Sequence, residues 1–218
     1  PEYVPEEHRP LFIQDADRIL FSEPFRRLAN KTQVHPLYEH DHIHHRLIHS
    51  VETSSVGRSL GIIIGHWLKT EDKCIPDGID KYSIAGTVQA ACLAHDIGNP
   101  PYGHSGEAAI GSWFEEYLSG SGELTSVSDS TRKELSSFEG NAQGFRILTR
   151  LEMYKERGGM RLSLPVLGAF QKYPARARTS EFLGKEHYIG LKKFGVFENE
   201  WQEFSSVAEK LGMIEEAS

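Results

Sequence analysis

The apolar residues of this 218-residue chain recur mainly every three or four positions, the spacing that places them on one face of an α-helix. Alternation of apolar and polar residues never persists long enough to predict a β-sheet, and no internal repeat is present. We therefore expect an all-α fold. The expected helices cover residues 17–30, 46–69, 82–95, 105–118, 138–148, 163–173 and 198–211.

Two of these helices carry patterns that predict how they pack. On helix 46–69, Leu47, Val51 and Ile62 recur at helical spacing and predict the inward face. Helix 82–95 contains small residues, among them Ala85 and Gly86, which permit another helix to approach closely. We therefore place helix 82–95 at the centre of the fold.

Local signals predict where other segments begin. Prolines at positions 1, 5 and 10 predict an irregular arm over residues 1–16. Ser22 followed by Pro24 is typical of a capped helix start. On helix 105–118, Ser105 is the predicted cap, and Trp113 and Tyr117 are predicted to face inward.

Composition limits the class of protein. With 39% hydrophobic residues the chain is too apolar to be disordered, and its length suits one sizeable core, so we expect one domain over residues 1–218. The net charge of −7 argues against a surface that coats polyanions, but it allows a local basic pocket and a small anionic substrate.

Other features indicate the compartment. No stretch approaches the roughly 18 apolar residues of a membrane span, and residues 1–7 lack the pattern of a signal peptide. Cys74 and Cys92 do not have a zinc-binding spacing, and Cys92 lies among apolar neighbours. These features fit a reducing compartment, and we expect the protein to be cytoplasmic and not to associate with membranes.

The candidate chemistry lies in the stretch Ala94–Glu107, Ala-His-Asp-Ile-Gly-Asn-Pro-Pro-Tyr-Gly-His-Ser-Gly-Glu. His95 and Asp96 end a helix, where the backbone is free to turn both side chains to one site. An imidazole next to a carboxylate suits a borderline divalent metal, but two ligands do not hold a catalytic metal. His104 opens the following helix, and Glu107 lies one turn further on, so these two side chains can meet.

A further ligand must come from elsewhere in the chain. Residues 31–49 hold six of the eleven histidines, and such a tract can be a pH sensor, an incidental metal-binding segment or the approach to an active site. His49 differs because it lies at the head of helix 46–69. A single histidine on such a face is more often a hydrogen-bonded core residue than a ligand.

Taken together, His49, His95 and Asp96 resemble the HD superfamily of metal-dependent phosphohydrolases, in which a helix His and a later His-Asp pair hold a divalent metal. Longer strings make the resemblance more specific. They are Asp-Arg-Ile-Leu-Phe-Ser-Glu-Pro-Phe-Arg-Arg-Leu-Ala-Asn-Lys-Thr-Gln-Val, Arg-Leu-Ile-His-Ser-Val-Glu, His-Asp-Ile-Gly-Asn-Pro-Pro-Tyr-Gly-His-Ser-Gly-Glu and Phe-Glu-Gly-Asn-Ala-Gln. Over residues 9–174 the motifs resemble the bacterial deoxynucleoside triphosphate triphosphohydrolases, the dGTPase-like family.

The resemblance implies an HD-domain helical fold and hydrolysis of a dNTP, with dGTP expected, to deoxynucleoside and tripolyphosphate. It implies that His49, His95 and Asp96 bind the metal, which can be Mg, Mn, Co, Fe, Ni or Zn. The family's site has a further Asp on a later helix, and no matching Ala-Asp-Asp segment precedes Ser218. Because of this, and because the chain does not begin with Met, we expect it to be the N-terminal part of a longer chain.

The reaction expels a nucleoside alkoxide, a poor leaving group unless it is protonated, so a general acid is valuable. His104 is placed to serve, and Glu107 can hold that imidazole in the needed tautomer. Whether His104 acts as acid, base or nucleophile stays open at this point.

The resemblance also implies the residues that bind the substrate. Gln33 is expected to contact the sugar, and Arg46, Asn141, Lys172 and Tyr173 to contact phosphates or sugar. For Arg46 the physical argument agrees, because a guanidinium one turn before His49 can form paired hydrogen bonds to phosphate oxygens.

Several alternatives and partners accompany this interpretation. The metal core alone also suits another HD phosphohydrolase, such as a nucleotidase or a phosphodiesterase, or a non-catalytic nucleotide-sensing module. The resemblance implies a homo-oligomer and allows a regulatory, allosteric nucleotide. Single-stranded DNA is an open partner that no sequence feature indicates.

Overall fold

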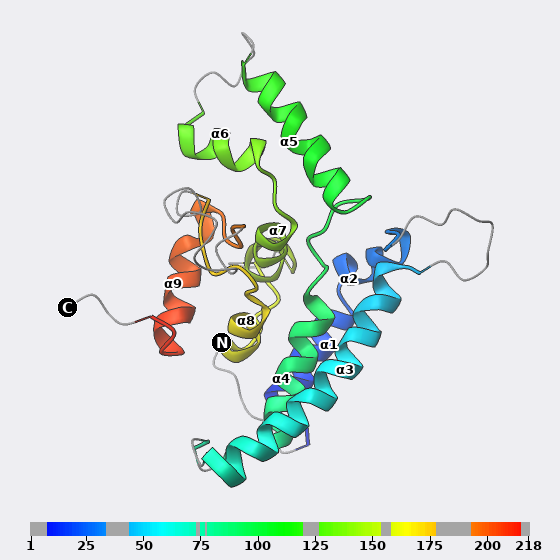
Figure 1. Cartoon of the computed structure of the whole chain (residues 1–218), viewed down its shortest axis with the longest axis vertical. Coiled ribbons are helices and arrows are strands. Elements are labelled where there is room, and N and C mark those ends of the chain that lie inside the picture. The colour runs from blue at the N-terminus through cyan, green and yellow to red at the C-terminus, as the bar shows by residue number, and fades with distance from the viewer. Residues whose placement is uncertain are drawn as a thin grey trace.

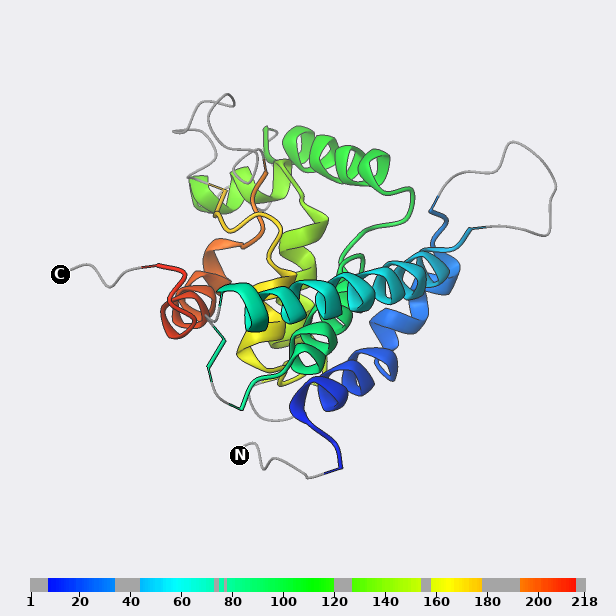
Figure 2. The ribbon, with the colours of Figure 1, turned by 60° about the horizontal axis from the view of Figure 1, so that its bottom comes forward.

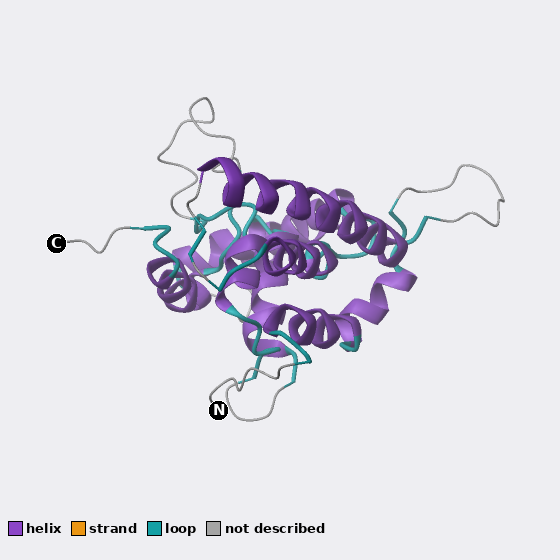
Figure 3. Ribbon diagram, turned by 90° about the horizontal axis from the view of Figure 1, so that it is seen from below, coloured by secondary structure: helices purple, strands orange, loops and turns teal. Residues whose placement is uncertain are grey.

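The computed structural model describes residues 8–33, 44–72, 75–76, 78–119, 127–153, 158–177 and 193–214. Among these residues the regular elements are helices, and the β-type pairing is limited to the isolated bridges Thr32–His45 and Arg176–Val196 (Figure 3). The expected all-α class is therefore confirmed. The α-helices are α1 (Leu11–Leu20), α2 (Glu23–Arg27), α3 (Arg46–Trp67), α4 (Lys81–Ala94), α5 (His104–Ser119), α6 (Asp129–Ser136), α7 (Gly140–Arg146), α8 (Leu164–Phe170) and α9 (Trp201–Lys210).

Side-chain caps explain where two of these helices begin. Ser22 Oγ accepts a hydrogen bond from the backbone N–H of Phe25, and Pro24 lies in the first turn of α2, as the sequence predicts. Asp80 accepts a hydrogen bond of 2.7 Å from the backbone N–H of Ser83 at the start of α4. Both caps satisfy a donor that the helix itself leaves without a partner.

Helix α4 is the element against which most of the fold is assembled. It packs against α1, α3 and α8, which agrees with its expected central place (Figure 1). The main core lies around it and draws on α1, α2, α7, α8 and α9. Its buried residues include Ile19, Phe25, Leu28, Leu93, Ile97, Phe145, Phe170 and Phe204.

Helices α3 and α4 lie side by side in two views of the molecule, and glycines on α3 permit their close approach (Figures 1 and 2). A Cβ atom at Gly61 would lie 2.7 Å from Cα of Ala85, and one at Gly57 would lie 2.6 Å from Sγ of Cys92. A larger residue at either position would push the two helices apart. The glycine stripe, which we define as Gly57, Gly61 and Gly65, therefore sets the distance between them.

The predicted inward face of α3 is only partly correct. Leu47 packs against the core, but Val51 is 43% exposed, because the small residues of the glycine stripe occupy the buried positions. Large apolar side chains lie on the outside of the same helix, namely Val56, Leu60, Ile63, Ile64 and Trp67. Within the described residues, no helix is long and apolar enough to cross a membrane.

Residues 11–16, which the sequence assigns to an irregular arm, are helical, because α1 already begins at Leu11. Pro10 occupies the position just before the first helical residue. A proline there loses no helical hydrogen bond, so it opens the helix instead of preventing it.

The predicted start and inward face of α5 are also wrong. The helix begins at His104, so Ser105 lies inside its first turn and does not cap it. Trp113 is 55% exposed and Tyr117 is 37% exposed, and their rings stack on each other at 4.9 Å. Helix α5 packs mainly against α6, which covers another side of it.

Replacing Gly61 tests the close helix approach. The variant Gly61→Val should lose about 2 to 3 kcal/mol of unfolding free energy, because its side chain meets the backbone of α4. The matched control is Ser59→Val, an exposed position on the same helix, which should change the free energy by less than about 0.5 kcal/mol. Chemical denaturation of both variants measures the difference, and equal stability would contradict the packing argument.

Candidate metal centre

The packing of α3 on α4 brings the three predicted ligands together. His49 lies in the first turn of α3, and His95 and Asp96 directly follow the last residue of α4. One ligand atom from each side chain lies within 4.8 Å of the others, and the ring centroids of His49 and His95 are 5.1 Å apart. Three side chains that are up to 47 positions apart in sequence thus converge on one point.

The local backbone fixes which nitrogen of His95 faces this point. Nδ1 of His95 lies 2.7 Å from the carbonyl oxygen of Cys92. Because a carbonyl can only accept, Nδ1 carries the proton and Nε2 of the neutral ring keeps its lone pair. Nε2 lies 3.4 Å from Oδ1 of Asp96, on the side where a shared cation would be bound.

The Asp96 carboxylate is buried, and each of its oxygens accepts one hydrogen bond. Arg46 Nη1 donates to Oδ2 at 2.7 Å, and Asn99 Nδ2 donates to Oδ1 at 2.6 Å. Gly103 makes room for the guanidinium, since a Cβ there would lie 2.6 Å from Arg46 Nη2. These contacts hold the carboxylate in one orientation and leave each oxygen a further lone pair for a cation.

The environment also favours the metal-binding form of His49. Burial lowers the pKa of its imidazole, and the nearby His95 lowers that pKa further, while the Asp96 carboxylate acts in the opposite direction. The neutral ring is therefore favoured, and a neutral ring offers a lone pair to a cation.

The donor set fits a divalent metal. Two imidazoles and one carboxylate suit borderline cations, and three protein ligands leave coordination positions for water or substrate. Within the described residues, His49, His95 and Asp96 form the group whose atoms could hold such an ion.

The structure places His104 and Glu107 differently from the expected pair. His104 is exposed at the start of α5. Glu107 is 8% exposed, accepts a hydrogen bond of 2.9 Å from the backbone N–H of Gly140 and lies 3.5 Å from Lys193 Nζ. These contacts tie the first turn of α5 to α7, so Glu107 has an anchoring role that the sequence did not reveal.

Apart from Arg46, the predicted substrate residues lie on three different segments. The amide of Asn141 donates to Glu139 at the start of α7. Lys172 is exposed just after α8, with its Nζ 5.4 Å from the ring centroid of Tyr173. Gln33 precedes the segment 34–43, which lies outside the described residues, and its Oε1 is buried without a partner among the described atoms. Their part in substrate binding stays a prediction.

Sequence reasoning missed the side chains that surround Asp96. Asn99 lies inside the recognised motif, and Lys31 lies in the earlier string that ends at residue 34, so both were visible as motif residues. Nothing in their spacing shows that Lys31 Nζ donates to the carbonyl oxygen of Asn99 at 2.7 Å. That contact joins positions 68 residues apart and appears only in the folded chain.

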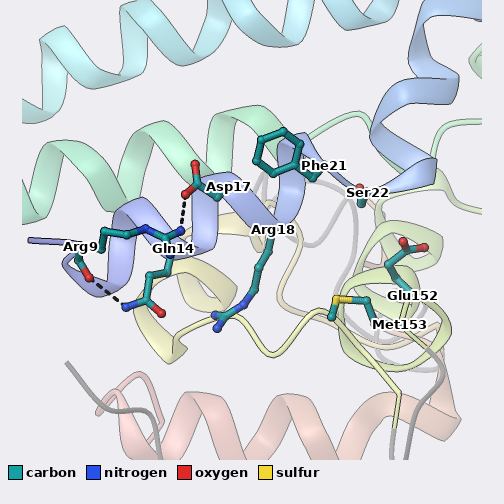
Figure 4. A pocket seen from close by; sticks show the side chains of 8 residues that line it. All are labelled: Arg9, Gln14, Asp17, Arg18, Phe21, Ser22, Glu152 and Met153. Atoms are coloured by element: carbon teal, nitrogen blue, oxygen red, sulfur yellow. Dashed lines mark hydrogen bonds and ion pairs between the residues drawn. The ribbon is translucent and has the colours of Figure 1, made fainter. Parts of the chain in front are cut away.

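Among the pockets formed by the described residues, two that lie outside the ligand cluster are close to the recognised motifs. One of about 390 Å³ lies beside the turn that follows Asp96 and includes Lys31 and Asn99 in its wall. Another of about 380 Å³ is formed by α1 and residues 152–153 (Figure 4). In the second pocket Arg9 pairs with Asp17 at 2.5 Å, so charges of both signs line it and we assign no function to it.

In the described part of the chain, the regular elements are helices. One His on a helix converges with a His-Asp pair at the end of the next helix, and this arrangement defines an HD-domain protein. Comparison with known proteins gives the particular family. No family model matches the chain. It is 50% identical, over 94% of its length, to a deoxyguanosinetriphosphate triphosphohydrolase-like protein of Pseudomonas aeruginosa, of which it covers 44%.

Two further relatives support the same assignment. The chain is 42% identical to a protein of the same description from Synechocystis, over 96% of the chain and 48% of that protein. It is 34% identical to a deoxyguanosinetriphosphate triphosphohydrolase of Salmonella typhimurium, over 92% of the chain and 44% of that protein. Over the part that it covers, the chain belongs to the dGTPase-like family, and it spans about half the length of these relatives.

The buried ion pair of Arg46 and Asp96 should matter more to folding than an exposed one. Arg46→Met leaves a buried carboxylate without its cation and should cost about 3 to 5 kcal/mol of unfolding free energy. The control is Arg176→Met, which breaks the more exposed pair with Glu198 and should cost about 1 kcal/mol or less. Denaturant unfolding measures the loss of unfolding free energy in each variant. Equal losses would contradict the larger contribution expected of the Arg46–Asp96 pair.

Proposed function

We propose that the protein carrying this chain hydrolyses a deoxynucleoside triphosphate, with dGTP the expected substrate, to the deoxynucleoside and tripolyphosphate. The proposal rests on the gathering of His49, His95 and Asp96 within 4.8 Å at the meeting ends of α3 and α4. The name of the Salmonella typhimurium relative describes this activity. Since the chain covers less than half of that protein, the activity is our proposal for the chain and not a property carried over from it.

His49 Nε2 or Nδ1, His95 Nε2 and one Asp96 oxygen would hold a divalent metal. Such an ion supplies Lewis-acid polarisation of the α-phosphate and lowers the pKa of a bound water. The protein's part is to turn Nε2 of His95 toward the site, through the contact of its Nδ1 with the Cys92 carbonyl, and to hold the Asp96 carboxylate in place through Arg46.

The leaving group needs a proton. Water adds to the α-phosphorus and loses its proton to solvent, while the bond from that phosphorus to the 5′ oxygen breaks. His104 gives a proton to the departing oxygen and regains one from solvent, to which it is exposed. Glu107 fixes the first turn of α5, to which His104 belongs, against Gly140.

For Arg46 we propose a role in addition to the predicted phosphate contact. Its Nη1 is bound to Asp96, so it also holds the metal ligand in place. The substrate roles of Gln33, Asn141, Lys172 and Tyr173, the single domain, the homo-oligomer, the regulatory nucleotide and the cytoplasmic location stay predictions.

Product analysis tests the proposed reaction. The chain is incubated with each of the four dNTPs and Mn²⁺, and the products are separated by chromatography. We expect tripolyphosphate and deoxynucleoside, and no turnover after chelation of the metal or in the Asp96→Ala variant. Monophosphate or inorganic phosphate as the product would contradict the proposal, and so would turnover that survives chelation.

The role of His104 has a separate test. His104→Ala should lower the rate about 10²- to 10⁴-fold while the affinity for Mn²⁺ stays unchanged. The control is Ser105→Ala, an exposed neighbour on the same turn. A His104→Ala protein that turns over at the wild-type rate would remove the proposed proton donor.

A further inference from the structure

Four residues around the candidate metal ligand form a closed ring of hydrogen bonds. Arg46 donates from its side chain to Asp96 at 2.7 Å and from its backbone N–H to the carbonyl oxygen of Lys31 at 2.9 Å. Lys31 Nζ donates to the carbonyl oxygen of Asn99 at 2.7 Å, and Asn99 Nδ2 donates to Asp96 at 2.6 Å. We call this the Asp96 ring, and it joins the segment after α2, the start of α3 and the turn after α4.

We propose that Lys31 and Asn99 are positioning residues that hold the Asp96 carboxylate in the orientation needed to bind the metal. The inference rests on the metal centre of the proposed function. Asn99 donates to Asp96, and Lys31 donates to the backbone of Asn99, so both residues act on the metal centre through Asp96.

The chemistry of the ring leaves Asp96 little freedom. Each carboxylate oxygen has its own donor, and the residue is 6% exposed, so rotation of the carboxylate would break a buried hydrogen bond. The direction of the Asn99 amide is also fixed, because a carboxylate accepts only from its NH₂ group. Its oxygen faces Gly140, where an added Cβ would lie 2.3 Å away.

Lys31 is held in this position at an electrostatic cost. Burial lowers its pKa, and the charges of Arg27 and Arg46 lower that pKa further. The Asp96 carboxylate acts in the opposite direction and raises that pKa, and the Lys31 ammonium points to the Asn99 carbonyl. The contact fixes the peptide group between Asn99 and Pro100 and so fixes the base of the Asn99 side chain.

Mn²⁺ affinity, measured by isothermal titration calorimetry on the whole chain, tests the proposal. Asn99→Ala should weaken Mn²⁺ binding about 10- to 100-fold, as loss of a contact to a metal ligand does elsewhere. Lys31→Met should also weaken Mn²⁺ binding, but by a smaller factor, because Lys31 lies one hydrogen bond further from Asp96 than Asn99 does. The matched controls Asn199→Ala and Lys210→Met change exposed residues just before α9 and at its last position, and both should bind Mn²⁺ as the wild type does.

Thermal unfolding in the absence of metal separates positioning from general stability. We expect Lys31→Met to keep the wild-type Tm while losing Mn²⁺ affinity, which a purely structural role would not produce. If Asn99→Ala fails to fold, Lys31→Met alone decides the matter.

The Asp96→Ala variant distinguishes failure of this inference from failure of the proposed function. If the wild type binds Mn²⁺ no better than Asp96→Ala, the metal centre is wrong and the inference falls with it. A different result overturns this inference alone. In that case the wild type binds Mn²⁺ and Asp96→Ala does not, while Lys31→Met and Asn99→Ala both bind it with wild-type affinity. The metal centre is then correct, and Lys31 and Asn99 do not position Asp96.

Discussion

The close approach of α3 to α4 is the constraint on which the rest of the site depends. Gly61 lies against the backbone of Ala85, and Gly57 against the side chain of Cys92, so no side chain of α3 separates the helices there. This contact lets the first turn of α3, with His49, reach the end of α4. Cys92, against which Gly57 packs, also supplies the carbonyl that sets the tautomer of His95. Helix packing and ligand geometry thus meet at the same residue.

A buried carboxylate is the second constraint, and it explains why so many polar groups converge behind the ligands. An isolated buried charge is costly, so Asp96 requires both a cation and further donors. Arg46 supplies the charge from α3, and Asn99 supplies a donor from the same turn. These hydrogen bonds orient the carboxylate, so it loses little freedom on binding a cation, which favours tight binding.

The parts of this structure that were predictable from sequence are those that local chemistry determines. The Ser22 cap, the α4 range and the turn after Asp96 depend on residues within a few positions of one another. The inward face of α3 was mispredicted because hydrophobic spacing marks Val51 as inward. Contact with α4 instead requires glycines, and the buried face of α3 is the one that carries the glycine stripe. The partners of Lys31 could not be predicted, because they depend on where three separate segments meet in space.

Glu107 makes contacts other than the one that its place in the motif suggests. Spacing of one helical turn suggests that it orients His104, but its oxygens face Gly140 and Lys193. Lys193 also lies 2.8 Å from Glu139, so one ammonium bridges two buried carboxylates from α5 and the residue before α7. The start of α5, where His104 lies, is therefore held by charge pairing. For the proton donor that we propose, a fixed backbone and an exposed side chain allow exchange of its proton with solvent between turnovers.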